Sequence, residues 1–461
     1  MLGSSSCSHH HRHQEQHQEE VHLQADLSRP QPPEMVEHLR QHHNHEIQQV
    51  HHQEVEMMSR LSSYNPPSVY LRHLLLSCAH SISRSDYTAA HRITTVLSSS
   101  SSPYGDSSER LIHSFTKALS LRLLLHLQPL PSTPSSIRSS YSSNYLDEND
   151  DAILQSSYLS LNQITPFIRF SQLTANQAIL DAIDQTHCLQ QQQQHPHDIH
   201  ILDFDIMHGV QWPPLMQAIV DRHQPPTLRI TATGTNLDVL HRTGNRLSKF
   251  AQSLGLRFRF FPLLLPQTNI NHTVDDVIDH LSAVHLLPNE ILAVNCVLYL
   301  HRFLIDREKL CLLLRKIKAM NPKVVTLAEK EANHNHPIFI SRFEEALNYY
   351  SAIYDSLEAT LPPNSRERME VEQVWFGREI TDIVATEGEK RRERHERFIS
   401  WETIMRIAGF QNIALSPFAL SQAKLLLRLH YPSEGYNLEV VNDSFFLGWQ
   451  KQPLFSVSSW H

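Results

Sequence analysis

Two carboxylates stand where a sheet protein could use them for chemistry. Asp203 and Asp205 come at the end of the apolar run 198–204, which the residue pattern predicts to be a buried strand. In open α/β sheets ligands bind beyond the carboxyl ends of the strands, so these aspartates are the best catalytic candidates in the chain. The alternative is structural, because a carboxylate at this place can bind nearby backbone or an internal arginine. We favour the structural interpretation.

The turn after this strand lacks the glycines that a nucleotide or S-adenosylmethionine site needs. Residues 206–210 are IMHGV, with one glycine, and the next predicted strand ends at 232–234 (ATG) without a carboxylate for ribose hydroxyls. The sequence contains no P-loop, no GxSxG and no HExxH motif. We therefore expect no enzyme, and no catalytic, cofactor-binding or metal-binding residue.

The composition of the chain argues against nucleic-acid-binding, disulfide-rich, secreted and membrane proteins. The chain has 461 residues, 40% of them hydrophobic, and a formal net charge of -8, so it can bury a large core but offers no broad cationic surface for nucleic acid. Its cysteines are odd in number and form no CxxC pair, which indicates reduced thiols rather than a disulfide framework or a zinc site. They are Cys7, Cys78, Cys188, Cys296 and Cys311. No apolar run predicts a secretion signal or a membrane span.

The N-terminal 67 residues differ from the rest. They are rich in His, Gln, Glu and Ser, with too little apolar material to offset the entropy of ordering, so we expect residues 1–67 to be disordered. Metal binding by the histidines is an alternative, because imidazole is a good ligand. Low-complexity breaks at 98–102, 128–151 and 190–194 are expected to be surface insertions between ordered elements.

Helical patterns dominate the next part of the chain. Apolar residues at three- and four-residue spacing predict helices over 71–82 and 111–119, and Thr174 is expected to cap a third helix. Residues 71–75 (LRHLL) also fit the LxxLL pattern of a helix that binds a partner's groove. The more economical interpretation is that these leucines are the buried face of a core helix.

Strands and helices then alternate. Strands are predicted over 198–204, 227–232, 257–261, 291–297 and 324–328, with a helix opened by Pro213 and another over 236–254. Such alternation predicts an α/β fold with a doubly wound, mainly parallel sheet of the Rossmann or methyltransferase-like kind. The closely spaced runs 438–441, 445–449 and 454–458 predict antiparallel C-terminal strands that carry packed aromatic residues.

Several blocks in order resemble the plant GRAS family of transcriptional regulators. Residues 199–203 (IHILD) with 209–213 (GVQWP) resemble its VHIID block, and leucine-rich stretches flank that block. Residues 377–380 (GREI) resemble the RE element of its PFYRE region. Residues 391–394 (RRER) and 458–460 (SSW) resemble its RVER and SAW motifs, with arginine for valine and serine for alanine. The resemblance covers about 68–461.

Two further segments are similar to the Lateral suppressor branch of that family, which belongs to its Scarecrow-like members. They are 355–364 (DSLEATLPPN) and 419–436, which includes HYPSEGY at 430–436. The resemblance implies a nuclear regulator of axillary meristem initiation and shoot branching. It implies a GRAS domain over 68–461, with a helical cap from 68–190 and part of 236–290 on an α/β core of about 195–461.

The resemblance also implies how the protein works. Family members act as homo- or heterodimers and as cofactors of DNA-bound transcription factors, so DNA is expected to be contacted mainly indirectly. Direct DNA binding, and a relic methyltransferase-like small-molecule site, are the alternatives. The charged run 387–397 is expected to be a solvated helix or a partner surface. The motif residues with a possible partner or structural role are His200, Asp203, Gly209, Gln211, Trp212, Pro213, Arg378, Glu379, Arg391, Glu393, Arg394, Trp449 and Trp460.

Overall fold

The computed structural model describes residues 67–127, 148–189, 198–265, 273–288 and 290–461. The expected disorder of the N-terminal region and its metal-binding alternative lie outside these residues. The chain divides into two units, Met1–Tyr70 and Leu71–His461, and the description below concerns the second. No helix among the described residues is long and apolar enough to span a bilayer.

A nine-stranded sheet forms the centre of this unit. Its order is β3-β2-β1-β4-β5-β9-β8-β7, with β6 paired to β9. The first five strands are parallel, and β7, β8 and β9 are antiparallel. Their bounds are β1 Asp198–Phe204, β2 Leu228–Gly234, β3 Phe258–Leu264, β4 Glu290–Val297, β5 Val324–Lys330, β6 Asn412–Ile413, β7 Tyr436–Val441, β8 Ser444–Trp449 and β9 Gln452–Trp460. The predicted α/β class, with a mainly parallel sheet and antiparallel C-terminal strands, is confirmed.

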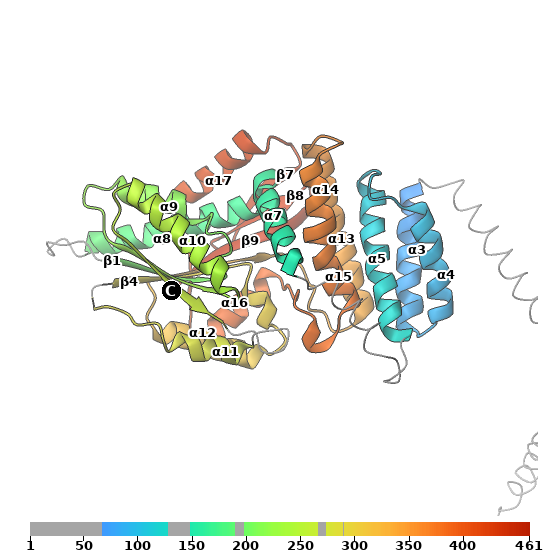
Figure 1. Cartoon of the computed structure of the whole chain (residues 1–461), viewed down its shortest axis with the longest axis horizontal. Helices are drawn as coiled ribbons and strands as arrows, with labels where there is room; N and C mark the ends of the chain where they lie inside the picture. Colours follow the sequence, from blue (N-terminus) through green and yellow to red (C-terminus); the bar gives the residue numbers. More distant parts are fainter. Residues whose placement is uncertain (1–66, 128–147, 190–197, 266–272, 289) are drawn as a thin grey trace, which may run out of the picture. The chain divides into compact units, whose positions relative to one another are not determined.

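Helices cover both faces of the sheet, because side chains of a strand alternate between its faces. Ile199 and Ile201 of β1 pack with α8, α9 and α10, whereas Leu202 and Phe204 pack with α11, α12 and α16 (Figure 1). These helices span α8 Pro166–Leu189, α9 Trp212–Val220, α10 Leu237–Ser253, α11 Val274–Leu281, α12 Arg307–Ala319 and α16 Phe398–Ile407. α17, Pro417–His430, packs on α8.

A second, all-helical layer is assembled from two distant parts of the chain. α5 packs against α4, α13 and α15 (Figure 1). The helices of this part are α3 Pro67–Ser83, α4 Tyr87–Ser100, α5 Ser107–Leu127, α7 Glu148–Ile164, α13 Phe339–Thr360, α14 Arg366–Glu370, the π-helix η2 Val371–Phe376 and α15 Gly377–Ala385. A buried ion pair, Arg110 to Glu372 at 2.7 Å, joins α5 to η2.

This assembly corrects the expected composition of the helical cap. α8 packs on β4, β5 and β9, and α10 packs on β2 and β3, so neither lies in the cap. α13 and α15 join the cap by packing on α5, and α14 joins it by packing on α7. Thr174 does not cap a helix, since it lies inside α8, which begins at Pro166. The leucines of 71–75 are buried, so their interpretation as a core face is confirmed and the LxxLL interpretation is wrong.

Candidate functional site

The point where the strand order reverses, between β1 and β4, is filled by a network of polar side chains. The sheet register places Asp203 of β1 beside Asn295 of β4, and Asn295 beside Thr326 of β5. Asp203 accepts hydrogen bonds from Trp212 Nε1 at 2.9 Å and from Asn295 Nδ2 at 2.8 Å. The amide of Gln211 donates to Asn295 Oδ1 at 3.0 Å. All of these groups are buried, so the network occupies the place where such a fold holds a ligand.

The loop between β1 and α9, which positions Gln211 and Trp212, has left-handed backbone at three positions. Asp205, Met207 and Gly209 have φ of 65°, 50° and 63°. A Cβ on Gly209 would lie 2.9 Å from the Thr243 methyl group, so glycine is needed for close contact with α10 as well as for its φ. Pro213, near the start of α9, then favours helix immediately after the loop.

Asp203 and Asp205 differ in environment. Burial raises the pKa of Asp203 to about 7, although the hydrogen bonds from Asn295 and Trp212 oppose the shift. Asp205 is partly exposed and pairs with Arg302 at 2.8 Å. Both carboxylates are thus engaged by protein groups, which supports their interpretation as structural residues.

His200 does not join this network. It lies on the opposite face of β1, where its Nε2 is 2.9 Å from Thr231 Oγ1 and its Nδ1 is 2.8 Å from Arg229 Nη2. Burial, helped by the charge of Arg229, lowers the pKa of His200 to about 3. Arg229 in turn pairs with Glu290, so His200 is a neutral member of a buried structural network.

A second buried cluster brings together motif residues that are far apart in the sequence. His301 Nδ1 lies 2.8 Å from Glu329 Oε2, and its Nε2 lies 3.4 Å from Glu393 Oε2. His395 Nε2 is 3.1 Å from the same oxygen of Glu393. Lys330 pairs with Glu379 at 2.5 Å. The cluster therefore connects the ends of β4 and β5 to α15 and to the segment that follows it.

In this cluster each buried charge is stabilised by a neighbouring group of opposite charge. Burial lowers the pKa of His301, but the carboxylates of Glu329 and Glu393 outweigh it and raise that pKa to about 9. Burial raises the pKa of Glu393, yet the neighbouring imidazoles of His301 and His395 carry it well below its usual range. Burial raises the pKa of Glu379 against the opposing charge of Lys330. Removal of one partner would leave another charge buried and unpaired.

The charged run 387–397 is not a solvated helix, which corrects one of our two expectations: residues 387–390 and 397 are exposed, whereas 391 and 394–396 are buried. Apart from one short 3₁₀ turn, Gly388–Lys390, it has no regular structure. Arg391 donates to the backbone of His334 at 2.7 Å, and Arg394 donates to Asn335 Oδ1 at 3.0 Å; both arginines are buried. Tertiary hydrogen bonds, rather than pairs within a helix, therefore satisfy the charges of this run.

The remaining motif residues lie apart from both clusters. Trp449 Nε1 donates to Asp355 Oδ2 at 2.6 Å, and Trp460 Nε1 donates to Ser458 Oγ at 2.8 Å. Both tryptophans are buried, as expected for aromatic residues that pack the closing strands. Arg378 alone among the motif residues is exposed.

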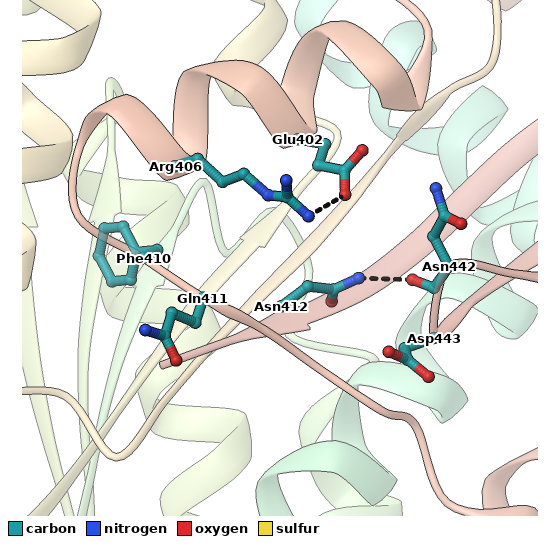
Figure 2. Close-up of a pocket in the computed structure, with 7 residues that line it drawn as sticks. All are labelled: Glu402, Arg406, Phe410, Gln411, Asn412, Asn442 and Asp443. Carbon is teal, nitrogen blue, oxygen red and sulfur yellow. Dashed lines mark hydrogen bonds and ion pairs between the residues drawn. The ribbon is translucent and has the colours of Figure 1, made fainter.

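A surface hollow of about 610 Å³ lies elsewhere, between the end of α16 and the β7–β8 turn. Figure 2 shows its polar lining, in which Arg406 pairs with Glu402 at 2.7 Å and Asn412 donates to the backbone of Asn442 at 2.5 Å. No residue of either buried cluster lines it. We therefore do not treat this hollow as the functional site.

Sequence reasoning missed several members of the two clusters. Asn176 of α8 joins the first network by accepting a hydrogen bond from Gln211 Nε2 at 3.1 Å. Asn176, Asn295 and Glu329 belong to no motif that signals chemistry, and only the sheet register and the packing of α8 place them. His395 had a signal, because it is two residues from Glu393, a spacing that places two side chains on one side of an extended segment. Because we expected a helix over 387–397, we did not predict that Glu393 and His395 lie close together.

Comparison with known proteins identifies the fold. Residues 71–461 match the GRAS domain family. Scarecrow-like protein 18 of Arabidopsis thaliana is 47% identical over 417 residues, which are 85% of this chain and 91% of that protein. Protein MONOCULM 1 of Oryza sativa subsp. japonica is 42% identical, over 84% of this chain and 88% of its own. The crystal structure of SCL7 in Oryza sativa matches with a TM-score of 0.67 and 32% identity, over 85% of this chain and 99% of that one.

These findings define the class of protein: a Rossmann-like sheet domain with a helical cap, in which side chains fill the switch point. The chain belongs to the GRAS family and is a plant transcriptional regulator of the Scarecrow-like kind. Members of this family are regulatory proteins rather than enzymes.

Proposed function

We propose that this protein is a nuclear transcriptional coregulator that acts through contacts with DNA-bound transcription factors and with other GRAS proteins. The observation that carries the proposal is the closed switch point, where Asp203, Asn295, Gln211 and Trp212 bind one another. A ligand there would have to break buried hydrogen bonds that the network already makes. The protein surface is then the part left for recognition, and the net charge of -8 favours protein over DNA as the direct partner.

We further propose a role in axillary meristem initiation and shoot branching, acting in the nucleus. Two observations support this role: the similarity to MONOCULM 1 and Scarecrow-like protein 18, and the segments 355–364 and 419–436 that resemble the Lateral suppressor branch. Homo- or heterodimers are part of the same proposal.

A selection experiment separates coregulation from direct DNA binding. The purified full-length protein is incubated with a random-sequence DNA pool at near-physiological salt, alone and then with plant nuclear extract. Recovery of one DNA motif only with extract is the expected result, and mass spectrometry of the bound fraction identifies the transcription factor. Enrichment of a motif by the protein alone would refute indirect contact and favour direct DNA recognition.

Arg378 provides a matched variant for this selection. Its side chain is exposed and its motif neighbour Glu379 is buried, so Arg378→Ala removes surface charge without opening the core. We expect Arg378→Ala to keep the unfolding temperature of the wild type and to weaken capture of the partner severalfold. Unchanged capture would exclude Arg378 from the partner surface.

A further inference from the structure

Three potential metal ligands converge in the buried His/Glu cluster. The nearest ligand atoms of His301, Glu393 and His395 all lie within 4.8 Å of one another. Glu393 Oε2 is 3.4 Å from His301 Nε2 and 3.1 Å from His395 Nε2. In a tetrahedral zinc site with bonds of about 2.0–2.1 Å, neighbouring ligand atoms are about 3.3 Å apart. Two of the three ligand separations are already close to that length, and the third, between the two Nε2 atoms, is within 4.8 Å.

The groups around the two histidines orient them as metal ligands require. A metal-bound histidine usually donates its other ring nitrogen to a carboxylate or another acceptor. His301 Nδ1 lies 2.8 Å from Glu329 Oε2, and His395 Nδ1 lies 3.0 Å from His334 Nδ1. The Nε2 atoms of His301 and His395 therefore both face Glu393.

These two Nε2 atoms are also the poorly satisfied ones. Both are buried and make no hydrogen bond of good geometry, although Glu393 is near. The histidine residues themselves are 3% and 0% exposed. Buried polar atoms are rarely left in this condition, and an ion between them and the carboxylate would satisfy both at once.

We propose that His301, Glu393 and His395 bind one divalent first-row transition metal ion, with zinc as the expected ion. Two imidazoles and one carboxylate are a ligand set that zinc uses when a fourth position is taken by water. The ion would fasten the irregular segment 391–397 to the η1 turn, Leu300–Phe303, after β4. This site departs from our expectation that the chain holds no metal ligands, and it does not depend on the proposed partner binding.

The test compares full-length wild type with Glu393→Gln, because a carboxamide keeps the shape of the side chain but is a poor ligand. Each protein is stripped with EDTA and titrated with Zn²⁺, while bound zinc and the unfolding temperature are measured. The N-terminal histidines are present in both proteins, so the difference between them isolates the cluster. Glu389→Gln, an exposed neighbour of the same chemistry, is the matched control.

We expect wild type and Glu389→Gln to bind one more equivalent of zinc than Glu393→Gln. Zinc at about a hundredfold above its Kd should raise their unfolding temperature by about 3–6 °C, and that of Glu393→Gln by much less. Equal zinc content and equal temperature shifts in all three proteins would overturn the proposal and leave the cluster as an ion-pair network.

A second measurement keeps the proposal testable if Glu393→Gln does not fold. Stripped wild-type protein is loaded with one equivalent of Co²⁺, and Glu329→Gln is loaded in parallel. Intense visible absorption typical of a four-coordinate Co²⁺ site, with affinity about 10–100-fold weaker in Glu329→Gln, is the expected result. Weak absorption that is identical in the two proteins would show that the metal binds elsewhere and refute the site.

Discussion

Asp203→Ala tests whether the switch point is a structural network or a ligand site. The change removes the acceptor of Trp212 Nε1 and one of two acceptors of Asn295 Nδ2, whose other acceptor is Gln211 Oε1 at 3.1 Å. An unsatisfied buried donor costs about 1–3 kcal/mol, so we expect a loss of about 2–4 kcal/mol in the free energy of unfolding at pH 5.

The expected loss depends on pH, and its sign follows from the pKa of Asp203. Burial raises that pKa to about 7 in the folded protein, whereas an unfolded Asp has a pKa of about 3.9. The wild-type side chain therefore contributes most stability below pH 4, and that contribution is lost as pH rises to 7. Alanine has no charge to bury, so the difference between the proteins should shrink by about 2–3 kcal/mol between pH 5 and pH 8.

Urea unfolding followed by far-UV circular dichroism at pH 5 and pH 8 measures both quantities. Asp205→Asn is the matched control, because Asp205 is partly exposed in its pair with Arg302 and such pairs contribute less than about 1 kcal/mol. A destabilisation by Asp203→Ala that grows with pH would refute the reasoning. So would a fully stable Asp203→Ala protein that has lost a ligand, since the carboxylate would then serve binding rather than folding.

Three further changes test the packing. Arg110→Ala removes the 2.7 Å partner of the buried Glu372, which keeps only Arg368 at 4.0 Å among the described residues, and should cost about 3 kcal/mol in urea unfolding. Lys309→Ala, in an exposed ion pair, should cost less than about 1 kcal/mol; equal losses would contradict the burial argument. In Gly209→Ala the new methyl group would clash with α10 and the residue would have to keep a positive φ, so we expect a loss of about 2–4 kcal/mol in the free energy of unfolding. Gly255→Ala has the same φ penalty but open space around the methyl group, so we expect a loss of about 1 kcal/mol. Thermal unfolding that ranks the two variants in the opposite order would refute this. Trp449→Phe loses one hydrogen bond and should lower the unfolding free energy by about 1–2 kcal/mol, and an unchanged value in the same urea assay would show that the bond contributes nothing.

Local patterns predicted most of the elements. The strand predicted at 291–297 is observed as β4, Glu290–Val297, and the helix predicted over 236–254 is observed as α10, Leu237–Ser253. Hydrophobic periodicity and turn residues depend only on residues that are close in the sequence, so they predict helices and strands without knowledge of the tertiary structure. The order of the family motifs likewise belongs to the sequence, and the match over 71–461 confirms it.

Thr174 and the run 387–397 show where local reasoning fails. A threonine before an apolar repeat has the pattern of an N-cap. The helix α8 nevertheless begins earlier, at Pro166, and its first turn packs on β9 through Phe167 and Phe455, a contact that the sequence does not display. Alternating Glu and Arg predict ion pairs along a helix. In the folded protein Arg391 and Arg394 instead satisfy backbone and side-chain acceptors in the segment 334–335 and in their own loop.

The sequence by itself determined the strand and helix alternation, the absence of a glycine-rich nucleotide loop, and the family, because each depends on residue types at short spacing. Only the tertiary structure decided which distant residues share a site. Asp203 meets Asn295 through the pairing of β1 with β4, and His301 meets Glu393 and His395 through the packing of the 391–397 segment against the end of β4. Their contact energies come from burial and charge compensation between parts of the chain about 90 residues apart, which no local pattern encodes.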